Sequence, residues 1–251
     1  MNLATMDNLS EILVAIPTYN EAENVKKLFE QIFKLNFKKD ILFLDDNSPD
    51  GTGEIIKMIQ SENKNVFAIH RIGKLGIGSA HQEIINFAYQ KGYKILVTMD
   101  CDFTHSPSSI IDFINNSDNY DVVVGSRYMK KDSLKDWNLI RKFLTNFGHI
   151  LTKYVLNLKE DATGAFRLYK LNNIPKQLFS LVESKSYSFF FESLFIISFN
   201  KFKIKEIPID LPSRTYGNSK MEIKDVIKSL KYLYLLLMRK YFNRQSLIIK
   251  N

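Results

Sequence analysis

Two aspartates separated by one residue give the strongest chemical signal in this chain. Asp100 and Asp102 follow an apolar, strand-like run over residues 93–99. Side chains at positions i and i+2 of a strand point to the same face, so the two carboxylates would repel each other unless a cation sits between them. Mg²⁺ and Mn²⁺ suit such a pair, because one or two carboxylates and substrate phosphates commonly hold these hard cations. The pattern predicts a metal-diphosphate site, and the alternative is a solvated turn.

The residues around this pair are weaker candidates for chemistry. His105 could approach the metal or the substrate, whereas Cys101 points to the opposite face and is expected to be a small buried side chain.

Gly76-Ile77-Gly78 lacks the full G-x-G-x-x-G spacing, so we interpret it as a structural turn, with Lys74 a candidate for phosphate contact. The chain has no G-x-x-x-x-G-K-S/T motif, which disfavours P-loop kinases and ATPases.

Length and composition indicate one large α/β domain. A chain of 251 residues can bury a full core, and its single cysteine excludes an internal disulfide and favours a reducing compartment. Residues 1–11 lack the pattern of a signal peptide, and no run of about 18 apolar residues predicts a transmembrane helix. The net charge of +8 suits an anionic partner, which could be a nucleotide, a phospholipid surface or a nucleic acid.

The first half of the chain alternates short apolar runs with amphipathic segments. This alternation predicts a parallel sheet covered by helices on both faces, in which ligands bind beyond the carboxyl ends of the strands. The expected strands are residues 12–17, 41–44, 66–69, 93–99 and 121–125, and the expected helices are residues 21–34, 52–62 and 79–91.

Four polar clusters fall at the carboxyl ends of these strands: residues 17–21, 45–50 and 100–104, and Arg127. Residues 45–51 could form only a turn with a helix cap, because Asp, Asn, Ser, Pro and Gly all favour turns. Two adjacent acids after a buried strand are more than a turn requires, however, and an acid there can accept hydrogen bonds from a ribose or a base. Together the clusters predict a nucleotide site at one edge of the sheet.

Motifs along nearly the whole chain, about residues 12–230, resemble a known family. The motifs at residues 17–21, 45–52, 100–102 and 124–128 occur in this order in family 2 glycosyltransferases with the GT-A fold. Those at residues 161–169, 186–192 and 214–220 narrow the resemblance to dolichyl-phosphate mannose synthases and other polyprenyl-phosphate glycosyltransferases. The implied fold is a Rossmann-like, mostly parallel sheet with helices on both faces, followed by C-terminal amphipathic helices.

The resemblance implies a role for each matching residue. It implies catalytic roles for Asp100, Asp102, Arg127 and Arg214, and a metal site for Mg²⁺ or Mn²⁺ at Asp100, Asp102 and Thr104. Some relatives carry Gln at the position of Thr104, and Ser or Gly at that of Ala165. The residues implied to bind the nucleotide-sugar are Pro17, Tyr19, Glu21, Asp46, Asp100, Cys101 and Asp102. Those implied to bind the acceptor phosphate are Arg127, Arg141, Thr145, Arg214 and Lys220.

The reaction that the resemblance implies is inverting transfer of a sugar to a polyprenyl phosphate. Mannose from GDP-mannose is the leading donor and a UDP-sugar the alternative, while the acceptor could be dolichyl or undecaprenyl phosphate. The alternative function is a family 2 enzyme with a lipopolysaccharide or another cell-surface polysaccharide as acceptor. Arg214 and Ser219-Lys220 favour the polyprenyl phosphate. Nucleic acid is not an expected partner, because the acidic edge of the sheet would repel it.

The last third of the chain has a different composition. Residues 187–202 are rich in Phe, and residues 221–242 form a long helical pattern with Leu230, Leu233, Tyr234 and Leu237 on one face and many basic residues. We expect a catalytic domain at residues 1–220, and at residues 221–251 an amphipathic helix and basic tail lying on a membrane, although a core helix is the alternative. The protein would then be cytoplasmic and peripheral to a membrane, where a small membrane subunit could join it.

One buried pair of charges is also expected. Arg167 and Glu192 could form a structural ion pair or contact the sugar directly, because buried charges need partners in either case.

Overall fold

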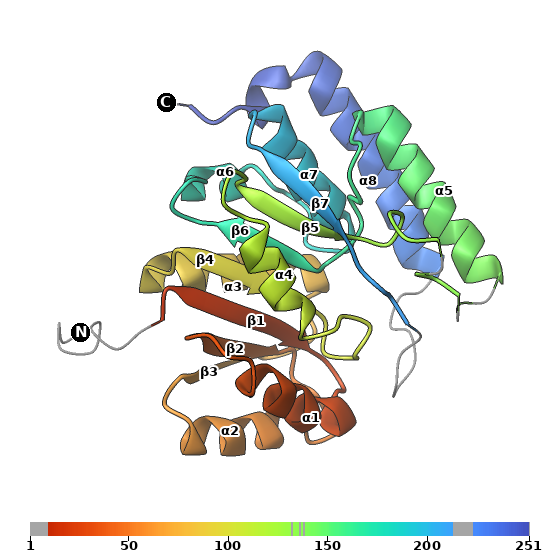
Figure 1. Ribbon diagram of the computed structural model, residues 1–251. Coiled ribbons are helices and arrows are strands. Elements are labelled where there is room, and N and C mark those ends of the chain that lie inside the picture. The colour runs from red at the N-terminus through yellow and green to blue at the C-terminus, as the bar shows by residue number, and fades with distance from the viewer. Residues whose placement is uncertain (1–9, 132, 136, 138, 213–222, 251) are drawn as a thin grey trace.

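A computed structural model of the protein describes residues 10–131, 133–135, 137, 139–212 and 223–250. A seven-stranded sheet runs through the molecule in the order β3-β2-β1-β4-β6-β5-β7, with helices on both faces (Figure 1). Only β6 runs antiparallel to its neighbours among these strands. The expected mostly parallel α/β sheet is therefore confirmed.

The first half follows the expected alternation closely. Its strands pair in parallel and in register, with Thr18 opposite Asp45 and Ala15 opposite Thr98. Parallel strands buried on both faces have continuous apolar sequences, and β1 and β2 are buried along almost their whole length. The elements are β1 (Ile12–Thr18), α1 (Ala22–Phe33), β2 (Asp40–Asp45), α2 (Thr52–Glu62), β3 (Val66–His70), α3 (Ile77–Lys91) and β4 (Ile95–Thr98).

The second half extends the sheet beyond β4. Strand β6 lies between β4 and β5, and β7 pairs with the other side of β5. Sequence reasoning did not locate β6 and β7, because both are short and carry charged residues. The elements are α4 (Ser109–Asn115), β5 (Val122–Ser126), α5 (Leu139–Leu156), β6 (Arg167–Lys170), α6 (Lys176–Ser180), α7 (Ser188–Phe199), β7 (Ile204–Pro208), α8 (Ile223–Phe242) and the 3₁₀ helix η2 (Arg244–Leu247).

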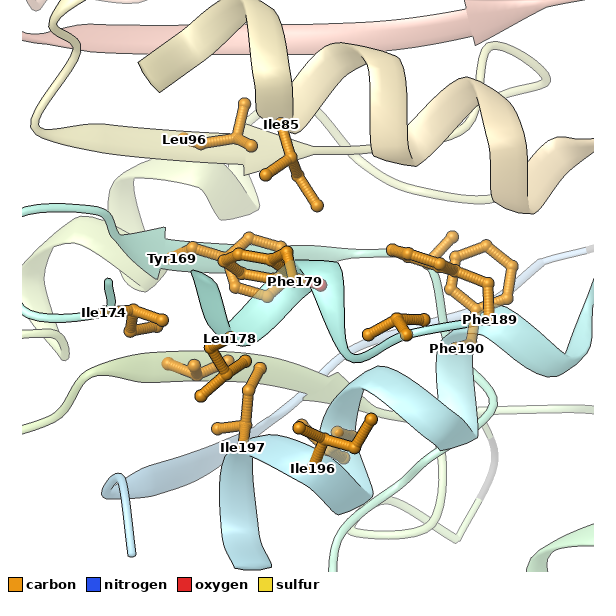
Figure 2. Packing of buried hydrophobic residues seen from close by; sticks show 14 of the residues in the cluster. Ile85, Leu96, Tyr169, Ile174, Leu178, Phe179, Phe189, Phe190, Ile196 and Ile197 are labelled. Carbon is orange, nitrogen blue, oxygen red and sulfur yellow. The ribbon is translucent and has the colours of Figure 1, made fainter. Parts of the chain in front are cut away.

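Two apolar clusters, one on each face of the sheet, form the core. The larger one fills the space between the sheet and helices α3, α6 and α7, where Ile85 and Leu96 lie across from Tyr169, Phe179 and Phe189 (Figure 2). Helix α7 is apolar on all sides and buried over residues 188–197, which explains its Phe-rich sequence. Leu233 and Leu236 join the same cluster, so one face of α8 belongs to the core.

Arg167 and Glu192 do not pair with each other, so the ion-pair alternative for these two charges is wrong. The Arg167 guanidinium donates instead to the carbonyl oxygens of Ala162 and Phe190, both at 2.9 Å. Glu192, buried in α7, pairs with Arg239 of α8 at 2.8 Å, and it also accepts the backbone N–H groups of Glu183 and Ser184. This buried charge pair fastens α8 to α7.

Candidate functional site

The ends of β1 and β2 are tied together by one aspartate. Asp45 accepts hydrogen bonds from the Thr18 hydroxyl at 3.1 Å and from the backbone N–H and hydroxyl of Ser48 at 3.0 and 2.5 Å. Ser48 in turn accepts the backbone N–H of Asn20 at 2.9 Å. Asp45 therefore has the turn-forming role that composition allowed for this cluster, and it fixes the loop that follows β1 against the loop that follows β2.

Asp46, the second acid of the cluster, makes a buried ion pair with Arg71, which follows β3. Arg71 also donates to the hydroxyl of Ser79 at 2.8 Å and thereby reaches the start of α3. Burial raises the pKa of Asp46, although the Arg71 guanidinium opposes this shift. Sequence reasoning missed Arg71, which the rule that ligands bind at strand ends could have indicated, because this residue directly follows a predicted strand.

The end of β1 is linked to this pair, because Asp46 donates its backbone N–H to the carbonyl oxygen of Thr18 at 3.0 Å. Lys74 Nζ lies 4.3 Å from the centre of the Tyr19 ring, in a cation–π contact. Glu21 is buried at the start of α1, where its carboxylate accepts from Asn24 Nδ2 at 2.6 Å and its backbone N–H donates to the Thr52 hydroxyl. Pro17 lies within β1, opposite Leu44. An aromatic ring with an ammonium group beside it is a surface that suits a nucleotide.

The acidic loop lies beyond the end of β4 rather than in the strand. Because β4 ends at Thr98, strand alternation does not place Asp100 and Asp102 on one face, and that part of the expectation is wrong. The Asp100 side chain is 36% exposed, whereas Asp102 is buried. Asp102 Oδ1 accepts the backbone N–H of Thr104 at 3.1 Å and its hydroxyl at 2.6 Å, so Thr104 orients this carboxylate. Cys101 is buried in the apolar cluster, as expected.

His105 holds the acidic loop through a hydrogen bond to the loop backbone. Its Nδ1 accepts the backbone N–H of Asp100 at 3.0 Å, and its ring stacks on Phe166 with the ring centres 4.9 Å apart. Burial lowers the pKa of His105, although the Asp100 and Asp102 carboxylates oppose this shift. A neutral His105 that accepts through Nδ1 holds the loop in place, which is a positioning role.

Arg127, which follows β5, is held by a buried carboxylate. Its Nε donates to Asp161 Oδ2 at 2.7 Å. Burial by itself would lower the pKa of Arg127, but the charge of Asp161 outweighs it and the pKa is raised, with a contribution from Asp100. Gly164 packs against the same guanidinium, since a Cβ there would lie 3.1 Å from Arg127 Nη2. Arg127 is therefore close enough to the acidic loop to feel the charge of Asp100.

Helix α5 is joined to this site through aromatic contacts. Tyr128 donates its hydroxyl to the carbonyl oxygen of Thr145 at 3.0 Å and stacks on His149, with the ring centres 3.8 Å apart. This hydrogen bond links Thr145 of α5 to Tyr128, the residue that follows Arg127. Arg141 belongs to α5, but its side chain lies outside the described part of the structure, as do Arg214 and Lys220.

The polar groups at the strand ends converge on one edge of the sheet, where acidic and basic side chains face each other. No group of three or more His, Cys, Asp or Glu side chains within the described ranges could hold a metal ion by itself. Such a site suits a ligand that brings its own phosphate oxygens, because Mg²⁺ is usually held by one or two carboxylates and by substrate phosphates.

Comparisons with known proteins place the chain among sugar-transferring enzymes. Residues 13–177 match the family model described as Glycosyl transferase family 2. Polyprenol monophosphomannose synthase of Mycolicibacterium smegmatis is 30% identical over 230 residues, which cover 90% of this chain and 87% of the relative. Undecaprenyl-phosphate mannosyltransferase of Micrococcus luteus is 31% identical over 211 residues, which cover 84% of this chain and 87% of the relative.

Solved structures share the fold at lower identity. Glucosyl-3-phosphoglycerate synthase from Mycobacterium tuberculosis, crystallised with Mn²⁺, UDP and glucosyl-3-phosphoglycerate, superposes with a TM-score of 0.57 and 16% identity, covering 96% of this chain and 81% of that one. A structure described as a mycobacterial protein gives a TM-score of 0.62 at 15% identity, and the match covers 94% of this chain and 76% of that one. These likenesses confirm the expected GT-A fold.

Proposed function

The chain belongs to glycosyl transferase family 2, and on that premise we propose that it transfers mannose from GDP-mannose to a polyprenyl phosphate with inversion of configuration. The observation that carries the proposal is the position of the Arg127–Asp161 pair beside the acidic loop at residues 100–104. The acidic loop suits a metal-bound diphosphate, and the Arg127–Asp161 pair suits a phosphate that is not bound to a metal. The two curated relatives, whose names specify lipid-linked mannosyl transfer, support this division of roles.

We assign the nucleotide to the ends of β1, β2 and β3. The Tyr19 ring and Lys74 would contact the nucleoside and a phosphate, while Asp46, oriented by Arg71, would accept hydrogen bonds from the ribose or the base. Pro17 and Glu21 would shape the pocket, and Glu21 does so by fixing the start of α1. Cys101 would contribute its backbone, because its side chain is buried in the core.

We assign the metal to Asp100, Asp102 and Thr104. The donors are carboxylate and hydroxyl oxygens on one loop, which fits a hard divalent cation such as Mg²⁺ or Mn²⁺. When bound, the cation would neutralise the charge that develops on the departing nucleoside diphosphate. The hydrogen bonds from Thr104 to Asp102, and from Asp100 to His105, keep the two carboxylates in position for it.

The acceptor needs cations rather than a strong base. A phosphate monoester is mostly a dianion near pH 7, because its second pKa is about 6. Arg127 would bind this dianion through its planar fork while Asp161 fixes the guanidinium, and Arg141, Thr145, Arg214 and Lys220 are the further proposed contacts. A phosphate oxygen then bonds to the anomeric carbon as the bond to the diphosphate breaks on the opposite face. An α-linked donor therefore gives a β-linked product.

We place the reaction at the cytoplasmic face of a membrane, because a polyprenyl acceptor lies in one. In the described part of the chain, no helix is both long and apolar enough to cross a bilayer. We therefore propose peripheral attachment through α8 and the residues after it, with a small membrane subunit as a candidate partner. Residues 1–220 would be the catalytic unit, although α8 packs on that unit through Leu233 and Leu236.

The test is an assay of lipid products. The purified chain is incubated with a panel of GDP- and UDP-sugars, polyprenyl phosphate and Mn²⁺, with and without EDTA, and the lipid product is identified by mass spectrometry. We expect mannosyl phosphopolyprenol from GDP-mannose and none in EDTA. A different sugar on the same lipid would correct only the donor. Transfer to a saccharide acceptor, with none to the lipid, would overturn the proposal in favour of a polysaccharide-directed enzyme.

A further inference from the structure

Two neighbouring helices carry stripes of apolar side chains that no other part of the described structure covers. On α5, Leu139, Phe143, Phe147, Ile150 and Tyr154 recur at helical spacing and are exposed, with Phe143 67% and Tyr154 78% accessible. The opposite side of α5 packs through Leu151, Val155 and Leu156 on the core. The stripe is therefore not the side that holds the helix to the protein.

Helix α8 repeats this arrangement beside α5. Ile227, Leu230, Tyr234 and Tyr241 are exposed along one line of the helix, while Leu233 and Leu236 are buried on another. The two helices lie side by side at one edge of the molecule (Figure 1), and Lys240 Nζ of α8 donates to the carbonyl oxygen of Val155 of α5 at 3.5 Å. We call the exposed apolar side chains of these two neighbouring helices, taken together, the α5–α8 face.

The charge of the two helices identifies what this face meets. Helix α5 has three basic residues and no acidic residue, and α8 has five basic residues and one acidic residue, Asp225. Lys153 of α5 and Lys224, Lys228 and Lys231 of α8 are exposed on the same two helices. Apolar and aromatic side chains flanked by lysines are the pattern of a helix lying in a bilayer interface that contains anionic lipid.

We infer that the α5–α8 face docks on an anionic phospholipid surface, with α5 inserting its aromatic stripe alongside α8. This inference rests on the proposed function and deepens it, because α5 also carries Arg141 and Thr145. An interfacial α5 would hold these residues at the depth of the phosphate groups, with the hydrocarbon chain of the acceptor in the lipid below. The contact that binds the membrane and the contact that binds the acceptor phosphate would then belong to the same helix.

The test compares matched pairs of polar substitutions in the full chain. F143Q/F147Q removes two rings from α5, and I227Q/Y234Q removes two side chains from α8. The control F33Q/M58Q removes two side chains of similar exposure, 49% and 58%, from α1 and α2, which lie at the other end of the sheet (Figure 1). Sedimentation with phosphatidylcholine vesicles, with and without phosphatidylglycerol, measures binding. Thermal melts show that each variant is folded.

We expect the unmodified chain and the control to bind phosphatidylglycerol vesicles and to be released by high salt, because salt screens the lysines. F143Q/F147Q should lose roughly tenfold in partitioning for each ring removed. In detergent with a short-chain polyprenyl phosphate it should keep its activity, whereas failure of the proposed function would abolish that activity in every variant, the unmodified chain included.

Three outcomes would overturn the inference. The first is vesicle binding by F143Q/F147Q equal to that of the control. The second is failure of the unmodified chain to bind lipid vesicles at all, which would assign the face to a protein subunit. The third is a dimer in light scattering that F143Q/F147Q converts to a monomer without loss of vesicle binding, which would assign the face to a second copy of the chain.

Discussion

Arg127 and Asp161 form a contact in which each residue holds the other charged. Burial would raise the pKa of Asp161, but the Arg127 guanidinium outweighs it and the pKa is lowered. The carboxylate also accepts the backbone N–H and the hydroxyl of Thr163, both at 3.2 Å. These bonds fix the backbone just before Gly164. A planar guanidinium fixed along one edge presents its remaining N–H groups in a constant direction, which is what a phosphate ligand requires.

Neutralising Asp161 should therefore damage stability and acceptor use together. Asp161→Asn leaves a buried guanidinium without its counter-charge, so we expect a loss of about 3–5 kcal/mol in unfolding free energy, measured by urea denaturation. The KM for polyprenyl phosphate should rise, while nucleotide affinity, measured by calorimetry, changes little. The matched control is Asp210→Asn, which breaks the exposed pair with Lys130 and should cost under about 1 kcal/mol. Equal effects of the two substitutions would contradict the role given to Asp161.

His81 should make the fold sensitive to acid. It is fully buried between Phe189 and Phe190, neither ring nitrogen has a hydrogen-bond partner in the described structure, and burial lowers its pKa to about 3. The unfolded chain, with an ordinary histidine pKa of about 6.5, binds this proton first. The contribution to stability is therefore complete above about pH 6.5 and is lost as the pH falls toward 3, by up to about 1.4 kcal/mol per unit.

The change that checks this is His81→Leu, compared with the same change at the exposed His70. Denaturant unfolding between pH 7 and pH 4 should show a shallower loss of stability in His81→Leu than in the unmodified chain. His70→Leu controls for the loss of one imidazole at an exposed position. An unaltered slope in His81→Leu would show that other groups dominate acid unfolding.

At the scale of elements, the Gly76-Ile77-Gly78 motif has a structural role as expected, but it forms the start of α3 rather than a turn. Gly76 has a φ of +98°, and a Cβ there would lie 2.6 Å from the carbonyl oxygen of Lys185. A Cβ at Gly78 would lie 2.6 Å from the carbonyl oxygen of Ser186 and 2.8 Å from Phe189 Cβ. The glycines let α3 approach the segment that leads into α7, and Ser79 donates its backbone N–H to the same Lys185 carbonyl at 3.2 Å.

Two glycine-to-alanine changes should have opposite effects for this reason. Gly78→Ala should lower the unfolding free energy by about 1–3 kcal/mol, because backbone must move to admit the methyl group. Gly148→Ala in α5, where nothing lies within 4 Å of the new Cβ, should raise it by up to about 1 kcal/mol through helix propensity. Thermal or urea unfolding of both variants measures the difference. Stabilisation by Gly78→Ala would mean that the two segments separate at little cost.

The elements of the first half were predictable because each strand there is an uninterrupted apolar run followed by an amphipathic helix. The strands of the second half are not of this kind, since β6 contains Arg167 and Lys170 and β7 contains Lys205 and Glu206. Helix α7 gives no periodic signal, because it is apolar on every side. Local patterns indicate a strand or helix only where one face differs from the other, or where both faces are buried in a long run.

The site was predictable to a similar extent and for related reasons. Strand ends mark the edge on which ligands bind, so Asp46, Asp100, Asp102 and Arg127 could be grouped from the sequence. Which charge pairs with which could not, because the partners are far apart along the chain. Glu192 meets Arg239 rather than Arg167, Asp46 meets Arg71, and Arg127 meets Asp161. Burial and distance decide such pairings, and neither is visible in a local motif.

At the scale of the whole molecule, α8 is both a structural element and a surface helix. Burial raises the pKa of Glu192, while backbone N–H groups and Arg239 oppose the shift. Arg239 also donates to the carbonyl oxygens of Leu181 and Ser246, both at 3.1 Å, so one side chain connects α8 to the α6–α7 segment and to η2. Removing α8 to test membrane binding would expose α7, which is why single substitutions on its outer line are the better probe.

Arg239→Ala should accordingly destabilise the protein without changing the nucleotide site. We expect a loss of about 3–5 kcal/mol in unfolding free energy, because Glu192 would remain buried without its cation. Arg244→Ala, which removes an exposed side chain near the end of the same helix, should cost under about 1 kcal/mol. Urea denaturation compares the two, and nucleotide affinity of the folded protein should be equal in both. A small loss for Arg239→Ala would mean that water or another cation replaces it at Glu192.

The position of β6 between β4 and β5 has a consequence for the newborn chain on the ribosome. Strands β1 to β4 can assemble as soon as they are made. Among the described strands, β5 pairs only with β6 and β7, so it waits until residues 167–170 are synthesised. At roughly 5–20 residues per second, the edge of β4 stays open for several seconds. Open strand edges attract other chains, so nascent chains arrested near residue 150 should bind chaperones and be cleaved by protease more readily than chains arrested well beyond β7. Equal protection of the two would show that β5 finds a temporary partner.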